Sequence, residues 1–203
     1  MNKTTTTRRS FLKSSLATGT AALICGTKGQ VSVHGANDRL RIAVAGLNGR
    51  GGSHISGWLG QKNVEIAYLI DPDEKAVARK MGEVEKKTKG KFNTKGISDI
   101  RQALADKSVD AISIATPNHW HALAAIWAIQ SGKDVYVEKP VSHNVSEGRR
   151  IVQFARKYGK IVQTGTQCRS MGGTIEAIDF IKAGKIGDVK IARGLCFKPR
   201  GSI

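Results

Sequence analysis

Residues 40–52 have the sequence LRIAVAGLNGRGG, a mostly apolar run followed at once by a cluster of glycines. The apolar run has the length and the β-branched content of a buried strand. The glycines that follow allow a tight turn and let a helix begin close to the strand. A buried strand that turns directly into a helix is the starting unit of a parallel sheet covered by helices.

The rest of the chain repeats this alternation of short apolar runs and longer helix-like segments. We expect further strands at residues 64–70, 109–115, 134–137 and 161–164. We expect helices at residues 73–87, from an Asn118 N-cap to a stop at Gly132, and from a capping box at Asn144 and Glu147 to Gly159. The pattern predicts an α/β fold, a Rossmann-type doubly wound parallel sheet, with a ligand crevice at the carboxyl ends of its strands.

The glycine cluster is a candidate phosphate-binding loop, because a helix start offers N–H groups and a positive dipole end to a pyrophosphate. The strict G-x-G-x-x-G pattern has glycine where this chain has Asn48. Asparagine tolerates left-handed backbone angles, so the turn can survive, with the approach of the phosphate displaced toward Gly49. The predicted cofactor-binding residues of the loop are Gly46, Leu47, Asn48, Gly49, Arg50 and Gly51.

Asp71 strengthens the prediction of a dinucleotide site. It ends the second expected strand, 20 residues after Gly51, where a carboxylate accepts both hydroxyls of an adenosine ribose. A carboxylate there repels a 2′-phosphate, so NAD is expected as the cofactor in preference to NADP. The alternative is an ordinary turn aspartate before Pro72.

Two further segments follow expected strands and border the same crevice: Thr116-Pro117-Asn118-His119-Trp120-His121 and Glu138-Lys139-Pro140. Together with the glycine loop they resemble the Gfo/Idh/MocA family, the relatives of glucose–fructose oxidoreductase and inositol dehydrogenase. The resemblance covers about residues 39–195. Residues 163–170 also resemble the segment that leads into the second domain of many exported members.

The resemblance implies roles for several of these residues. Thr116, Asn118 and His121 would line the nicotinamide half of the cofactor, and Pro117 and Gln167 complete the predicted cofactor-binding set. Glu138 and Lys139 would lie under the nicotinamide and the substrate, with Lys139 as the catalytic residue that hydrogen-bonds the reacting oxygen. Adjacent strand residues point to opposite faces, so Glu138 need not neutralise Lys139.

Several alternatives stay open for these side chains. Lys139 could be an ordinary surface lysine. His119 and His121 diverge at a helix start, and no Cys/His cluster supports them, so we expect no metal site. Trp120 and Trp127 are expected to pack their helix rather than to stack on a ligand.

The resemblance implies hydride transfer between nicotinamide and a hydroxyl or carbonyl carbon of a sugar or polyol. Two other functions remain open. Some exported relatives are NAD-dependent glycosidases of the same fold, which oxidise the sugar only transiently. The chain could also be an inactive dinucleotide-binding fragment.

Residues 1–36 are expected to be a signal peptide. Residues 7–13, TRRSFLK, resemble the twin-arginine export motif, and the run at 14–24 is too short and polar to anchor in a membrane. This predicts the twin-arginine machinery as a partner and a periplasmic or other extracytoplasmic location. The net charge of +17 falls to +12 without this segment, and no motif supports nucleic-acid binding. Three cysteines are too few for a disulfide framework.

The expected domains are the signal, a nucleotide-binding domain at 37–165 and the start of a truncated second α+β domain at 166–203. In that last segment we expect a helix at 174–183 and a first strand at Val189–Cys196. A single strand cannot form a sheet, so the chain is expected to be an N-terminal fragment that is inactive alone. The complete protein could form homo-oligomers.

Overall fold

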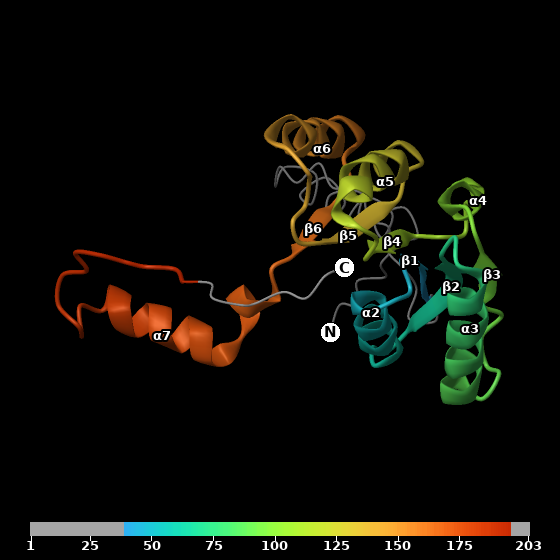
Figure 1. Cartoon of the computed structure of the whole chain (residues 1–203), viewed down its shortest axis with the longest axis horizontal. Coiled ribbons are helices and arrows are strands. Elements are labelled where there is room, and N and C mark those ends of the chain that lie inside the picture. The colour runs from blue at the N-terminus through green and yellow to red at the C-terminus, as the bar shows by residue number, and fades with distance from the viewer. Residues whose placement is uncertain (1–38, 196–203) are drawn as a thin grey trace, which may run out of the picture. The chain divides into compact units, whose positions relative to one another are not determined.

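The computed structural model describes residues 39–195, and the structural statements below concern that part of the chain (Figure 1). The predicted twin-arginine signal at residues 1–36 lies outside the described residues, as do Cys25 and Cys196. Cys168 is described, and its thiol is free and exposed.

Six parallel strands form one sheet in the order β3-β2-β1-β4-β5-β6. The strands are β1 (Leu40–Ala45), β2 (Val64–Ile70), β3 (Lys95–Ile97), β4 (Ala111–Ile114), β5 (Asp134–Glu138) and β6 (Val162–Gly165). In β1, Leu40 lies beside Val64 of β2 and Ile42 lies beside Ala111 of β4. The direction of winding reverses between β1 and β4, and ligands bind at such a switch point. The predicted Rossmann-type α/β fold is therefore confirmed.

Helices cover both faces of the sheet (Figure 1). They are α2 (Arg50–Leu59), α3 (Glu74–Thr88), α4 (Ile100–Ala105), α5 (Asn118–Gln130) and α6 (Val145–Tyr158). Alternate side chains of β1 point to opposite faces. Ile42 and Val44 join the core under α2 and α3, whereas Ala43 and Ala45 join the core under α4, α5 and α6. Burial on both faces explains why β1 and β2 are almost continuously apolar.

Several predicted element boundaries are confirmed and others are corrected. The expected bounds of β1 and β2 match the structure, and the Asn144 side chain caps α6 by accepting from Glu147 N. Asn118 is not the N-cap of α5: Pro117 holds that position in an extended conformation, and Asn118 is the first helical residue. β4 is shorter than the predicted 109–115.

A short 3₁₀ helix, η1 (Gln167–Ser170), and a helix, α7 (Gly172–Lys182), follow β6. The apolar residues of α7, among them Ile175 and Phe180, are exposed. The predicted strand Val189–Cys196 is wrong over its described part, because residues 189–195 join no β-ladder. An apolar run becomes a strand only where a neighbouring strand supplies hydrogen bonds.

Across residues 39–195, every helix is too short or too polar to cross a membrane.

Candidate dinucleotide-binding and active site

The loop between β1 and α2 needs glycine at two positions. Gly46 has a φ of 83°, and a Cβ there would lie 2.6 Å from the backbone of Ala115 and Thr116. A Cβ on Gly51 would collide with the carbonyl oxygen of Gly46. The first glycine therefore lets the turn pass close to the end of β4, and the last lets α2 begin against the turn.

The middle of the loop is open to a ligand. Asn48 does not adopt the left-handed conformation that its position suggested; the positive φ falls on Gly49, at 50°. A Cβ on Gly49 would meet no atom within 4 Å. Gly51 N donates to Asn48 O and Gly52 N to Gly49 O. Among the described residues, no acceptor is recorded for the N–H groups of Asn48, Gly49 and Arg50, which leaves three donors at the start of α2 for an anion.

Asp71 ties the second strand to this loop. Its Oδ2 accepts from Leu47 N at 2.8 Å and its Oδ1 accepts from Asp73 N at 3.0 Å. The Asp71 residue is 8% exposed. Leu47 thus contributes no free N–H to an anion, and its side chain lies in the core. Each oxygen of Asp71 retains a second lone pair, so the predicted contact with ribose hydroxyls is compatible with this geometry.

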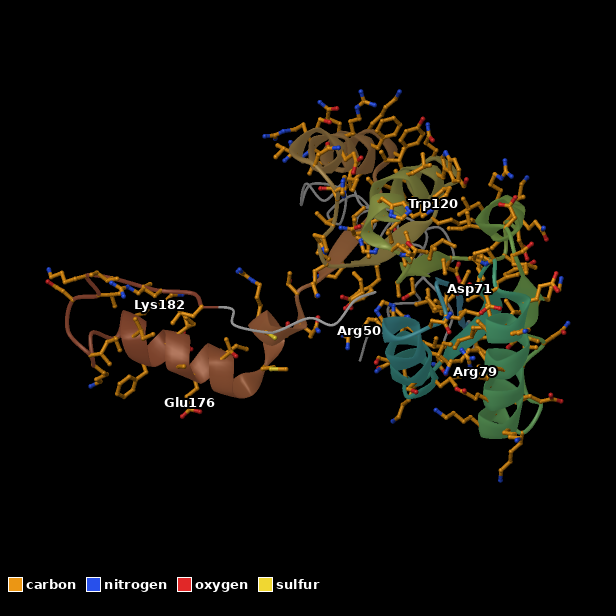
Figure 2. All side chains as sticks on the ribbon, in the orientation of Figure 1. Arg50, Asp71, Arg79, Trp120, Glu176 and Lys182 are labelled. Atoms are coloured by element: carbon orange, nitrogen blue, oxygen red, sulfur yellow. The ribbon has the colours of Figure 1, made fainter. Side chains whose placement is uncertain are left out.

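A cavity of about 540 Å³ opens beside Gly46 at the carboxyl ends of β1, β2 and β4. Its wall includes Ile70, Thr116, Pro117, Trp120 and Trp127. Trp120 is 45% exposed, and its ring lies 6.4 Å from that of Trp127. The two rings contact each other along α5, as expected for helix packing, and both also line the cavity; Figure 2 labels Trp120 on this helix.

Thr116 Oγ1 is buried and has no hydrogen-bond partner among the described residues. A buried hydroxyl without a partner costs free energy, so a ligand atom at this wall would satisfy it. A dinucleotide fits these three features together: the unpartnered Thr116 hydroxyl, the three free N–H donors and the apolar cavity.

His121 lies behind the crevice rather than on its surface. It is 2% exposed, and its ring nitrogens lie 2.8 Å from Thr116 O and 2.6 Å from Pro140 O. The ring joins the loop after β4 to the loop after β5. His121 therefore holds two loops of the site together, and the structure places no free ring nitrogen toward a nicotinamide.

Glu138, at the end of β5, is a buried carboxylate that faces α2. Its Oε1 accepts from Arg50 Nε at 2.8 Å and from His54 Nε2 at 3.1 Å, and its Oε2 accepts from Lys139 N at 3.2 Å. Burial raises the pKa of Glu138, but these hydrogen bonds outweigh it and hold the pKa below its ordinary value. The hydrogen bond between Arg50 and Glu138 raises the pKa of Arg50.

The hydrogen bonds continue from Glu138 into the protein. His54 Nδ1 lies 2.9 Å from Ser113 Oγ, which accepts from Trp58 Nε1 at 2.9 Å. An indole N–H only donates, so the chain is satisfied when Ser113 donates to His54 and His54 donates to Glu138. The ring of Tyr136 makes T-shaped contacts with the rings of His54 and Trp58. These hydrogen bonds hold the Glu138 carboxylate in place from the protein interior.

Lys139 directly follows β5 and is exposed, before a cis bond to Pro140. Glu138 contacts only its backbone, so the Lys139 ammonium is not neutralised by its neighbour. Gln167, in the amide orientation that satisfies its hydrogen bonds, accepts from Arg50 Nη2 at 2.9 Å and donates to Gly165 O. Asn118 is exposed at the first position of α5. The described residues contain no cluster of three or more metal-ligating side chains.

The sequence analysis did not identify His54, Ser113 and Trp58, which complete this network. Ser113 lies 55 to 59 residues from its partners, and no local pattern marks it. The signal available was weak: His54 and Trp58 are four residues apart on one face of a helix that follows the glycine loop.

A Rossmann sheet with an open phosphate loop at its switch point defines a dinucleotide-binding protein. Residues 40–166 match the family model described as "Oxidoreductase family, NAD-binding Rossmann fold". This chain therefore belongs to the Gfo/Idh/MocA oxidoreductase family.

Three similar proteins illustrate this membership. An uncharacterised oxidoreductase from Rhizobium meliloti is 33% identical over 46% of this chain and 28% of its own length. A glycosyl hydrolase family 109 protein from Shewanella is 29% identical over 61% of this chain and 27% of its own. The crystal structure of an NAD-binding oxidoreductase from Klebsiella pneumoniae has a TM-score of 0.61 and 26% identity, covering 73% of this chain and 40% of that one. The chain spans about a quarter to a third of the length of the curated relatives it matches.

Proposed function

We propose that this protein is an NAD-dependent oxidoreductase that transfers hydride between nicotinamide and a hydroxyl or carbonyl carbon of a sugar or polyol. The observation that carries the proposal is the phosphate loop. Three N–H groups at the start of α2 point to no protein acceptor within the described residues, beside a cavity with an unpartnered Thr116 hydroxyl.

The parts of a dinucleotide match separate features of this crevice. The N–H groups of Asn48, Gly49 and Arg50 suit the pyrophosphate. Asp71 suits the adenosine ribose, and the adenine ring suits the cavity beside Trp120, whose face offers stacking. An uncompensated carboxylate at Asp71 favours NAD over NADP. The similar structure from Klebsiella pneumoniae is described as an NAD-binding oxidoreductase, which supports a nicotinamide dinucleotide as the cofactor.

When bound, the nicotinamide ring supplies the group that accepts or gives the hydride. The residues of this chain hold the other reactant. Lys139 is exposed at the end of β5, where its ammonium donates a hydrogen bond to the reacting oxygen. Glu138 holds the backbone of Lys139 through its N–H and so acts as a positioning residue.

The substrate class rests on the family resemblance, whose named members act on sugars and inositol, and on the glycosyl hydrolase relative. That relative is matched over only 27% of its own length, and a dehydrogenase and an NAD-dependent glycosidase of this fold share the nucleotide-binding part. We therefore keep oxidation and reduction as the proposed chemistry and use the glycosidase reaction as an outcome of the test.

Calorimetric titration of NAD⁺ into the chain tests cofactor binding, and we expect a one-to-one complex. Turnover is tested in a protein that also carries the region of its relatives beyond this chain. With a panel of sugars and polyols, NADH absorbance should rise. Release of phenol from an aryl glycoside without net NADH formation would show the glycosidase instead. A chain that binds no dinucleotide would contradict the proposal.

A further inference from the structure

Arg79 reaches from α3 to the phosphate loop. Its Nη2 donates a hydrogen bond to Asn48 Oδ1 at 2.6 Å, and the two residues are 31 positions apart in the sequence. Figure 2 labels Arg79 on α3, the helix that lies beside α2. A charged donor makes a shorter and stronger hydrogen bond than a neutral one, so this contact restrains the Asn48 side chain.

Asn48 stands where the strict dinucleotide-binding pattern has its second glycine. That glycine allows the backbone to approach the pyrophosphate. A side chain at this position adds four heavy atoms beside the three free N–H groups. Unrestrained, it can rotate over those groups, because both it and the neighbouring Gly49 are exposed.

The backbone of the loop does not solve this problem. The positive φ is carried by Gly46 and Gly49, and Asn48 keeps an ordinary conformation. Its side chain must therefore be kept from the ligand by a contact, and the structure records one, to Arg79.

We propose that Arg79 is a positioning residue for the cofactor loop, which holds the Asn48 side chain against α3 and keeps the pyrophosphate site open. Arg79 and Asn48 together replace the missing glycine. The proposal rests on the proposed dinucleotide binding. It predicts that Arg79 matters only while residue 48 carries a side chain.

A double-mutant cycle on the whole chain tests this dependence. NAD⁺ affinity is measured by calorimetry for the wild type, Arg79→Ala, Asn48→Gly and the double variant. Loss of the charge-assisted hydrogen bond should weaken NAD⁺ binding about five- to tenfold in Arg79→Ala. Asn48→Gly should bind at least as tightly as the wild type. In the Asn48→Gly background, Arg79→Ala should change the affinity less than about twofold, since no side chain remains to restrain.

Arg149→Ala, on the exposed surface of α6, removes the same charge elsewhere and should leave the affinity unchanged. Circular dichroism checks the fold, and Arg79→Met, which retains the apolar stem, replaces Arg79→Ala if that variant unfolds. An equal loss of affinity in both backgrounds would overturn the proposal, because Arg79 would then act directly on the anion. Unchanged affinity in Arg79→Ala would also overturn it. A wild-type chain without NAD⁺ affinity would instead contradict the proposed function.

Discussion

Glu138 accepts a hydrogen bond from Arg50 at 2.8 Å, across 88 positions of the chain. Arg50 is the first residue of the helix that follows the phosphate loop, and Glu138 precedes Lys139. The contact therefore connects the end of the site that suits the pyrophosphate to the end that carries the candidate catalytic lysine. His54 binds the same carboxylate oxygen from the next turn of the helix.

Glu138→Gln should destabilise the protein, because buried His54 and exposed Arg50 both lose their anionic acceptor. We expect a loss of about 1–3 kcal/mol in the free energy of unfolding, measured by urea denaturation at neutral pH. Glu176→Gln, on the exposed surface of α7, is the matched control and should change stability by less than about 0.5 kcal/mol. Equal effects of the two changes would show that the network contributes nothing to stability.

Lys139→Ala should reduce turnover by a factor on the order of 10² in a form of the protein that acts on substrate. NAD affinity should stay within a few fold, since Lys139 is proposed to act on the reacting oxygen. Steady-state kinetics and cofactor titration measure the two quantities on the same sample. Nearly unchanged turnover would make Lys139 an ordinary surface lysine.

The Asp71 carboxylate should favour NAD⁺ over NADP⁺ by about an order of magnitude or more in dissociation constant. Asp71→Asn should lower this ratio, because the repulsion of a 2′-phosphate disappears. The ratio is measured on one protein and is therefore insensitive to a partial loss of folded material. Asp188→Asn, at an exposed position, should leave it unchanged. Equal binding of both cofactors by the wild type would contradict the assignment.

Asp106 gives the fold a pH-dependent contribution. Hydrogen bonds from Ser108 and from the Tyr68 hydroxyl lower its pKa to about 2. A depressed carboxyl pKa means that the folded state favours the ionised form, so this stabilisation is present above pH ~4 and is lost as the pH falls through ~2. Tyr68→Phe should therefore cost about 1 kcal/mol near neutral pH and less near pH 2, measured by urea denaturation at both values. A cost that does not depend on pH would show that Asp106 is not the cause.

Replacement of Arg8 and Arg9 by lysine tests the predicted export route. A twin-arginine signal carries folded proteins, and nicotinamide dinucleotides are kept in the cytosol, so we expect the variant to remain there with its cofactor. Cell fractionation and analysis of bound NAD measure both properties. Export of the variant at the wild-type level would contradict the signal.

The sequence predicted well those elements that a local pattern encodes. The bounds of β1 and β2 follow from apolar runs that end at turn residues, and the cap of α6 follows from the spacing of Asn144 and Glu147. β3 has only three residues, one of them glycine, so no apolar run in the sequence predicted it. The N-cap of α5 was misplaced because proline, which has no capping side chain, holds the position through its fixed backbone.

The site could be predicted only in its outline. Loop residues and strand ends were identified because they follow apolar runs directly. The hydrogen bonds of Glu138 to Arg50 and His54 were not predicted. They depend on which side of β5 the carboxylate faces and on a helix 84 to 88 residues away. The role of Arg79 was hidden for the same reason. Only the folded backbone brings α3 to the phosphate loop.

Gly165, on the edge strand β6, lies against the Glu138 carboxylate. A Cβ there would lie 2.9 Å from Glu138 Oε1, so even alanine must displace the carboxylate that Arg50 and His54 bind. Positions on edge strands usually accept many residues, yet a substitution at this one requires the Glu138 side chain to move. In a saturation library selected for folded protein, substitutions at Gly165 should therefore survive less often than substitutions at the neighbouring exposed Thr166. The substitutions tolerated at Gly165 would then depend on the Glu138 carboxylate of the adjacent strand β5.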